Sequence, residues 1–132
     1  MTKTKVAFAL CLLMLLIVSG NASSKGGSEV TLTGQVVCSN CWFEEDRKEK
    51  PYGSEDDIAC AIRCAKRKVP QALAVIGESE TTLYILEPGK AKTDLLKLIG
   101  KQVKVTGTVR EDGDKKYLSV DSITPVATNT GK

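Results

Sequence analysis

Four cysteines in the middle of the chain are the residues best suited to chemistry. Two residues separate Cys38 from Cys41, and three separate Cys60 from Cys64. Side chains four positions apart share one face of a helix, so each thiol of the second pair reaches toward a third group rather than toward its neighbour. The nearest such group is the Cys38–Cys41 pair. We therefore expect the four thiols to converge in one cluster.

Two chemical states suit such a cluster. Two disulfides could join the Cys38–Cys41 pair to the helix, or four thiolates could hold one soft ion, with zinc and copper as candidates. Asp57 lies three residues before Cys60 on the same predicted helix face and is a candidate additional metal ligand. A thiol-redox or metal-handling role is the alternative function. Redox pairs normally open a helix, whose dipole lowers the thiol pKa, whereas Cys38 and Cys41 follow a predicted strand.

Residues 1–22 have the features of a signal peptide. Lys3 and Lys5 precede an apolar run from Val6 to Val18, and small residues follow as far as Ala22. The run is shorter than the roughly 20 residues that cross a bilayer as a helix. We expect cleavage near Ala22, no stable membrane span afterwards, and an exported bacterial chain that is periplasmic or secreted. Cysteines in exported chains favour disulfides.

The composition argues against several classes of function. The chain has no histidine, which removes the commonest general base and the usual serine and cysteine triads. It carries 19 basic and 16 acidic residues, and two of the basic ones belong to the predicted signal peptide. Because the positive and negative charges nearly cancel, the chain lacks the excess of positive charge on which nucleic-acid binding depends. We expect a non-enzymatic binding module whose partner is a small molecule, a metal or a protein, and we expect no nucleic-acid binding.

Five segments in which apolar and polar side chains alternate predict β-strands. In the clearest segment, Val103 and Val105 face one way while Lys104 and Thr106 face the other. The five segments are residues 30–36, 71–77, 81–87, 103–110 and 116–123. Their inward-facing side chains are expected to include Val36, Val103, Val105, Leu118 and Val120.

The order of these elements predicts an all-β domain with small helices, built as a five-stranded OB-like β-barrel. A short helix between the third and fourth strands is expected to begin at Thr93 as its N-cap and to end at Gly100. Its apolar face comprises Leu95, Leu96 and Ile99. The domain spans residues 30–124, after a flexible leader at residues 23–29 and before a tail at residues 125–132.

Residues 38–70 form a cysteine-bearing helical insertion between the first and second strands. An insertion of this length is usually either functional or disordered. Its charged run, residues 44–50, is predicted to be a solvated loop. Ser54 is the expected N-cap of a helix with acidic residues in its first turn. This helix should run to about Lys68, before Pro70 stops it.

Two stretches of the chain resemble a group of uncharacterised exported bacterial OB-fold proteins. They are Cys-Ala-Ile-Arg-Cys-Ala-Lys at residues 60–66, followed by Pro70, and Leu-Ile-Gly-Lys-Gln-Val-Lys-Val-Thr-Gly-Thr-Val at residues 98–109. The similarity extends over residues 30–123. It implies an exported OB-fold domain and brings no assigned activity. The family pattern has Asp in place of Cys38 and His in place of Asp57, so each position keeps a side chain that can bind a metal.

Overall fold

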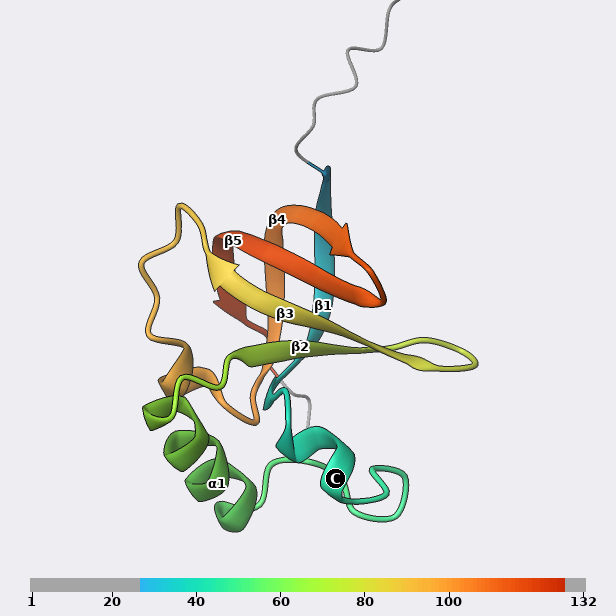
Figure 1. Cartoon of the computed structure of the whole chain (residues 1–132), viewed down its shortest axis with the longest axis vertical. Coiled ribbons are helices and arrows are strands. Elements are labelled where there is room, and N and C mark those ends of the chain that lie inside the picture. The colour runs from blue at the N-terminus through green and yellow to red at the C-terminus, as the bar shows by residue number, and fades with distance from the viewer. Residues whose placement is uncertain (1–26, 128–132) are drawn as a thin grey trace, which may run out of the picture.

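The computed structural model describes residues 27–127, which contain five strands, one α-helix and two single turns of 3-10 helix (Figure 1). In chain order they are β1 (Ser28–Cys38), η1 (Cys41–Glu44), α1 (Glu55–Lys66), β2 (Gln71–Ile76), β3 (Thr81–Pro88), η2 (Leu95–Leu98), β4 (Gln102–Asp112) and β5 (Lys115–Pro125). The predicted signal peptide and residues 128–132 of the predicted tail lie outside the described residues. No helix within residues 27–127 is both long and apolar enough to span a membrane.

The five strands close into a barrel in the order β1-β2-β3-β5-β4, and β4 pairs again with β1. Neighbouring strands are antiparallel except for β3 and β5, which run parallel. The prediction of a mostly-β domain with a five-stranded barrel is confirmed. The leader was predicted two residues too long, because Ser28 and Glu29 pair with Val109 and Thr108 of β4 and so belong to the barrel.

The barrel core is made by the inward side of the predicted alternation. Val36, Val103, Val105 and Leu118 are completely buried, and Val120 is nearly so. Burial of such side chains is the main favourable contribution to folding, at about 1.5–3 kcal/mol for each one. The inward faces of the strands were therefore predicted correctly.

Strand β4 bends where its pairing with β5 shifts register, between Thr106 and Gly107. A Cβ atom at Gly107 would collide with the carbonyl oxygen of Ser119 on β5. Only glycine therefore allows the two strands to approach so closely at the bend. This contact helps β4 to curve around the core and to reach β1 on its other side.

The inserted helix α1 and the turn η1 lie together beneath the end of the barrel at which β1 finishes (Figure 1). Ser54 caps α1 as predicted, and the helix ends at Lys66, slightly earlier than expected. Both elements contact the end of β1. For this reason Val37 and Cys38 are completely buried although Val37 points away from the inward-facing Val36.

The helix predicted between the third and fourth strands is a single 3-10 turn, η2. Its N-cap is Asp94 rather than Thr93, because the Asp94 carboxylate accepts a hydrogen bond of 3.1 Å from the backbone N–H of Leu96. Leu96 is partly exposed, whereas Leu98 and Ile99 are buried against the core. The turn is followed by Gly100, whose φ of +81° lies in the left-handed region.

We expect Val105→Asp to unfold the domain. The substitution buries an unpaired carboxylate in the barrel core, at a cost of several kcal/mol in a domain whose total stability is about 5–15 kcal/mol. Circular dichroism and urea titration of the purified variant measure this directly. Lys104→Asp is the matched control, since Lys104 is exposed on the same strand. A soluble, cooperatively folding Val105→Asp variant would contradict the assignment of the strand faces.

Candidate functional site

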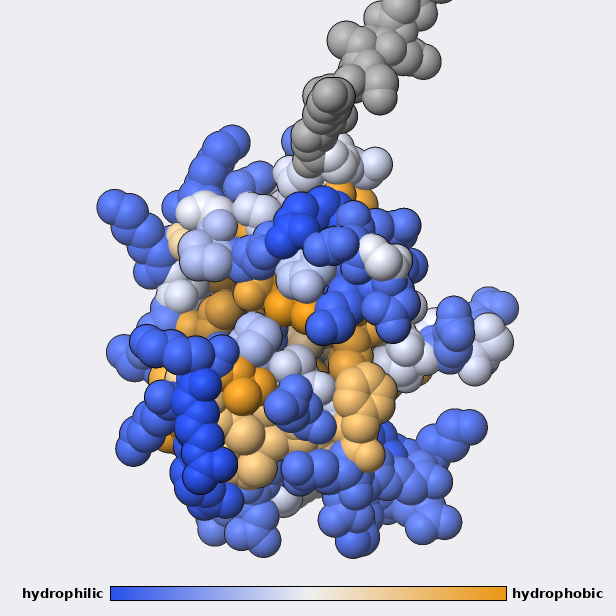
Figure 2. Space-filling view, in the orientation of Figure 1, coloured by the Kyte–Doolittle hydropathy of each residue, from blue (hydrophilic) through white to orange (hydrophobic). Residues whose placement is uncertain are grey.

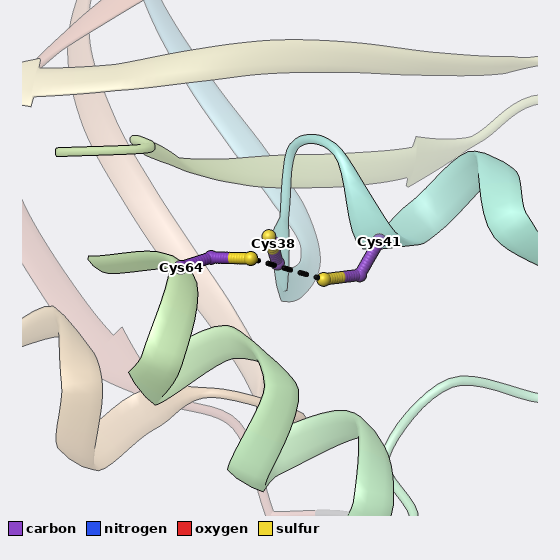
Figure 3. A group of neighbouring side chains, drawn as sticks. All are labelled: Cys38, Cys41 and Cys64. Carbon is purple, nitrogen blue, oxygen red and sulfur yellow. Dashed lines mark hydrogen bonds between the residues drawn. The ribbon is translucent and has the colours of Figure 1, made fainter. Parts of the chain in front are cut away.

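The four thiols gather beneath the end of β1. The Sγ atom of Cys41 lies 2.9 Å from that of Cys60 and 3.7 Å from that of Cys64. The sulfur atoms of Cys38, Cys41 and Cys64 all lie within 4.8 Å of one another (Figure 3). All four thiols are free. The convergence expected from their spacing is therefore present, with Cys41 at its centre.

Three different elements supply these sulfur atoms. Cys38 is the last residue of β1, Cys41 is the first residue of η1, and Cys60 and Cys64 lie one turn apart on α1. Directly after β1, the backbone N–H of Ser39 donates a hydrogen bond of 3.3 Å to the carbonyl of Pro70, which directly precedes β2. The two ends of the insertion are thereby held together, and the thiol cluster lies between them and α1.

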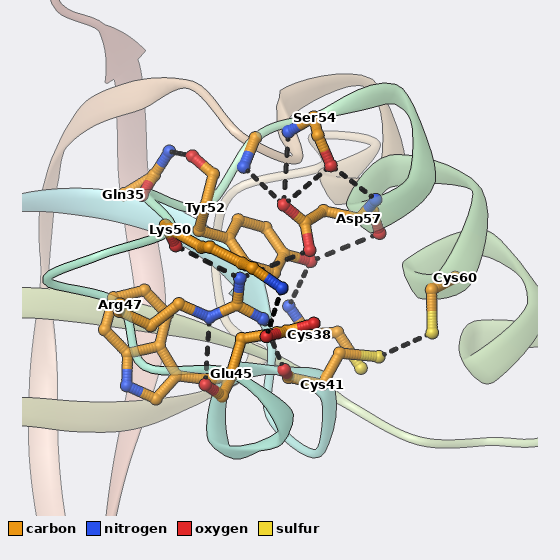
Figure 4. Close-up of polar contacts among 12 residues, drawn as sticks. Gln35, Cys38, Cys41, Glu45, Arg47, Lys50, Tyr52, Ser54, Asp57 and Cys60 are labelled. Carbon is orange, nitrogen blue, oxygen red and sulfur yellow. Dashed lines mark hydrogen bonds and ion pairs between the residues drawn. The ribbon is translucent and has the colours of Figure 1, made fainter.

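Arg47 holds the first half of the insertion in place (Figure 4). Its guanidinium donates hydrogen bonds of 2.6 Å to the carbonyl of Cys41 and 3.0 Å to the carbonyl of Trp42. It also stacks over the Tyr52 ring, with its central carbon 4.9 Å from the ring centroid. The side chain of Arg47 is only 10% exposed. The prediction of a fully solvated charged run is therefore wrong at Arg47, although its charged neighbours are exposed.

Tyr52 connects this arrangement to the barrel. Its buried hydroxyl accepts a hydrogen bond of 3.0 Å from the backbone N–H of Cys38. The Gln35 amide of β1 donates to the carbonyls of both Tyr52 and Gly100, at 2.7 and 2.8 Å. Burial raises the pKa of Tyr52 to about 12, so the phenol stays neutral at neutral pH. One cysteine of the cluster is thus fixed through a tyrosine that β1 itself positions.

Asp57 has a different position from the one that its candidate role requires. Its carboxylate accepts hydrogen bonds from the backbone N–H groups of Gly53 and Ser54, at 3.0 and 3.1 Å, and completes the N-terminal capping box of α1. Its other oxygen lies 3.4 Å from the Arg47 guanidinium. Burial raises the pKa of Asp57, but the hydrogen bonds from Gly53 and Ser54 and the charge of Arg47 outweigh it, so the net pKa is lowered.

Glu44, rather than Asp57, is the carboxylate that lies near the cysteine sulfurs. Among residues 27–127, two groups of metal-capable side chains have their ligand atoms within 4.8 Å of one another. One is Cys38, Cys41 and Cys64, and the other is Cys41, Glu44 and Cys60. Neither group includes Asp57. Sequence reasoning missed Glu44 because it placed this residue in the solvated run; its spacing of three from Cys41 becomes informative only once η1 is known to be a 3-10 turn.

Two of the thiols, those of Cys41 and Cys64, have raised pKa values. Burial, followed by hydrogen bonding to Cys60, raises the pKa of Cys41, and burial likewise raises the pKa of Cys64. Reactive redox cysteines have lowered pKa values, because the thiolate is the attacking form. The raised pKa values of Cys41 and Cys64 therefore argue against thiol-redox catalysis at these two residues.

A groove of about 410 Å³ separates the insertion from the barrel. Phe43 of η1 and Leu83 and Ile85 of β3 line it, with Lys115 and Lys116 of β5 at its polar side. Apolar surface gathers in the middle of the face shown in Figure 2, surrounded by charged groups. An apolar floor with a few polar groups is typical of ligand pockets.

The chain was compared with protein-family models, with curated proteins and with solved structures, and no match was found. The cysteine cluster and its supports are therefore interpreted from their own geometry.

We expect Arg47→Gln to loosen the insertion. The substitution leaves the carbonyls of Cys41 and Trp42 without their charged donor, so the free energy of unfolding should fall by about 2–4 kcal/mol. Urea denaturation gives this value, and limited proteolysis should locate new cleavage within residues 38–70. Lys48→Gln is the matched control, because Lys48 is an exposed residue of the same charged run. Equal stability and proteolysis of the two variants would contradict the role assigned to Arg47.

The contribution of Asp57 should disappear in acid. Its folded-state pKa lies below the usual 3.8, so the ionised carboxylate stabilises the fold above pH 3.8, and this stabilisation is lost as the pH falls through the folded-state pKa. Asp57→Asn should therefore cost about 1–2 kcal/mol at pH 7 and much less in strong acid. Urea titrations across this pH range test the sign. Asp56→Asn, an exposed neighbour, should show only the weak helix-dipole effect.

Proposed function

We propose that this chain is an exported, non-enzymatic OB-fold module that binds one soft metal ion through its cysteine cluster. Cu(I) is the ion that we favour, with Cys38, Cys41 and Cys64 as its ligands. The observation that carries this proposal is the central position of Cys41, which has three other thiols within reach. A disulfide uses one partner for each sulfur, whereas a metal ion gathers several sulfurs around one point.

The strand arrangement supports the OB-fold part of this proposal. A five-stranded barrel closed through a parallel β3–β5 pair, with a short helical turn between β3 and β4, has the element order of that fold. Many such domains bind their ligands with loops placed on the barrel end and face. Export rests on the N-terminal sequence alone, through its basic start and apolar run.

The sulfur spacing supports a metal ion. Thiolates held at about 2.3 Å from a tetrahedral zinc ion lie about 3.8 Å apart, and Cys41 and Cys64 are separated by 3.7 Å. Cuprous ions prefer thiolate sulfur and accept three ligands, and three sulfurs form one mutually close group here. Zinc, which also binds thiolate sulfur, is the second candidate ion.

Structural disulfides are the second candidate state of the cluster. The shortest sulfur separation joins Cys41 to Cys60, and Cys38 and Cys64 lie within 4.8 Å of each other. Oxidation would therefore pair Cys41 with Cys60 and Cys38 with Cys64, joining the end of β1 and η1 to α1. Closing a loop of this size contributes about 3–4 kcal/mol in the chain-entropy description, and an exported chain meets oxidising conditions.

Thiol counting together with elemental analysis decides between these states. We expect the chain purified from its host without reductant to carry about one copper ion, and thiols to react only after a chelator removes it. About one zinc ion would identify the second candidate. Absence of both metals together with absence of free thiols would establish the disulfide state and contradict the metal proposal.

Cys64→Ser should weaken copper binding by more than about a hundredfold, since even changes beside a metal ligand cost ten- to a hundredfold. Competition with a chromophoric Cu(I) chelator under reducing conditions measures the affinity. Ala59→Ser places a hydroxyl at an exposed position of the same helix and should leave the affinity unchanged. Equal affinities of the two variants would contradict the assignment of Cys64 as a ligand.

A further inference from the structure

The proposed metal site leaves one thiol of the cluster unused. The mutually close sulfur atoms are those of Cys38, Cys41 and Cys64. Cys60 is outside this group, yet its Sγ atom lies 2.9 Å from that of Cys41, nearer than the Sγ atom of Cys64 at 3.7 Å. In Figure 4 the Cys60 sulfur points from α1 at the Cys41 sulfur. Cys60 therefore contacts the central ligand of the proposed site without being a ligand itself.

The exposure of Cys60 suits a reaction with a molecule from solvent. Its side chain is half-buried, whereas those of Cys38 and Cys41 are buried. Cys64 is also half-buried, but its sulfur is occupied by the ion in the proposed metal-bound state. Of the four clustered thiols, Cys60 alone is then both uncoordinated and within reach of solvent. The ligand thiols are protected until the ion is removed, and Cys60 is the exception.

We propose that Cys60 is the redox-sensitive thiol of the cluster, which reacts with a small-molecule disulfide, pairs with Cys41 and thereby releases the bound copper. This inference rests on the proposed function and adds a control of metal release to it. Because Cys41 is the central ligand, a covalent bond between Cys41 and Cys60 takes one of three sulfurs away from the ion. Only Cys38 and Cys64 then remain to hold it.

The reaction consists of two thiol–disulfide exchanges. In the first, the Cys60 thiolate attacks one sulfur of the small disulfide, forms a mixed disulfide and expels one small thiolate. In the second, the Cys41 thiolate leaves the copper ion and attacks the Cys60 sulfur, which expels the second small thiolate. Two electrons pass from the two cysteines to the small disulfide. One expelled thiolate takes up the proton that Cys60 lost, the other takes up a proton from water, and copper remains Cu(I).

The experiment follows copper release from the loaded chain. The reduced chain is loaded with Cu(I) without oxygen and then mixed with hydroxyethyl disulfide. This disulfide is uncharged, so the Glu44 carboxylate, which lies within 4.8 Å of the Cys60 sulfur, does not repel it. Bicinchoninate captures and colours the released ion, at a concentration at which the untreated chain keeps its copper. All chains carry Cys11→Ser, so that the four clustered thiols are the only ones.

We expect the disulfide to weaken copper binding by more than about a hundredfold, since it removes a ligand and even changes beside a ligand cost ten- to a hundredfold. Peptide mapping at the time of release should show Cys41 bonded to Cys60. Cys38 and Cys64 should still be reduced.

Two variants remove the reactive thiol. Cys60→Ser and Cys60→Ala should both keep their copper in the presence of the disulfide, with an affinity close to that of the parent. Agreement between them separates loss of the thiol from any effect of the serine hydroxyl. Ala59→Ser changes the exposed neighbouring position and is the matched control, which should release copper as the parent does.

Three results would overturn the inference and leave the proposed function intact. The first is release of copper from both Cys60 variants at the parent rate. The second is a loss of affinity in both variants as large as that in Cys64→Ser, which would make Cys60 a permanent ligand. The third is a loaded parent that keeps its copper or forms a different first disulfide. Failure of the proposed function is recognised separately, because the parent chain would then take up no copper before any disulfide is added.

Discussion

The largely buried guanidinium of Arg47 is the group on which the candidate site depends. A buried charge is tolerated only when its hydrogen-bonding groups and its charge are compensated. Here the carbonyls of Cys41 and Trp42 receive its hydrogen bonds, Asp57 neutralises it, and Tyr52 covers it. The hydrogen bonds and the ion pair of this guanidinium fix the start of η1 relative to the start of α1. The distance between Cys41 and the cysteines of α1 follows from that arrangement.

The barrel contributes rigidity rather than chemistry. Its closed strand order fixes the end of β1, and the backbone N–H of Gly100 donates to the carbonyl of Val36 at 2.7 Å beside the amide of Gln35. A Cβ at Gly100 would approach the Cα of Gly53 to 3.3 Å, so the segment before β4 packs closely on the insertion. Cys38 therefore belongs both to the barrel and to the thiol cluster. This is how a short domain can hold a long insertion in one conformation.

The chemistry available to the cluster follows from what surrounds it. Without histidine in the chain, thiols and carboxylates are the metal-binding side chains at hand. Burial raises the pKa of Cys41 and Cys64, which keeps these thiols protonated and lowers their reactivity toward other molecules. The same proximity also allows the Cys41–Cys60 and Cys38–Cys64 pairs to be oxidised. Under the proposed function, the redox state of the compartment would select between the metal-bound state and the disulfide state.

The sequence by itself determined the features that depend on local periodicity. Alternation placed Val103 and Val105 in the core, Ser54 marked the start of α1, and the spacing of Cys60 and Cys64 predicted convergence with the other cysteines. Only the tertiary structure decided the partners of Arg47, Asp57 and Glu44. All three side chains are charged, and from the sequence alone a charged side chain is expected to face solvent or to bind a nearby ligand. Periodicity predicts which face of an element a residue occupies, but it does not predict which groups lie opposite that face. The opposing groups come from elements far apart in the chain, and packing of the insertion under the barrel brings them together.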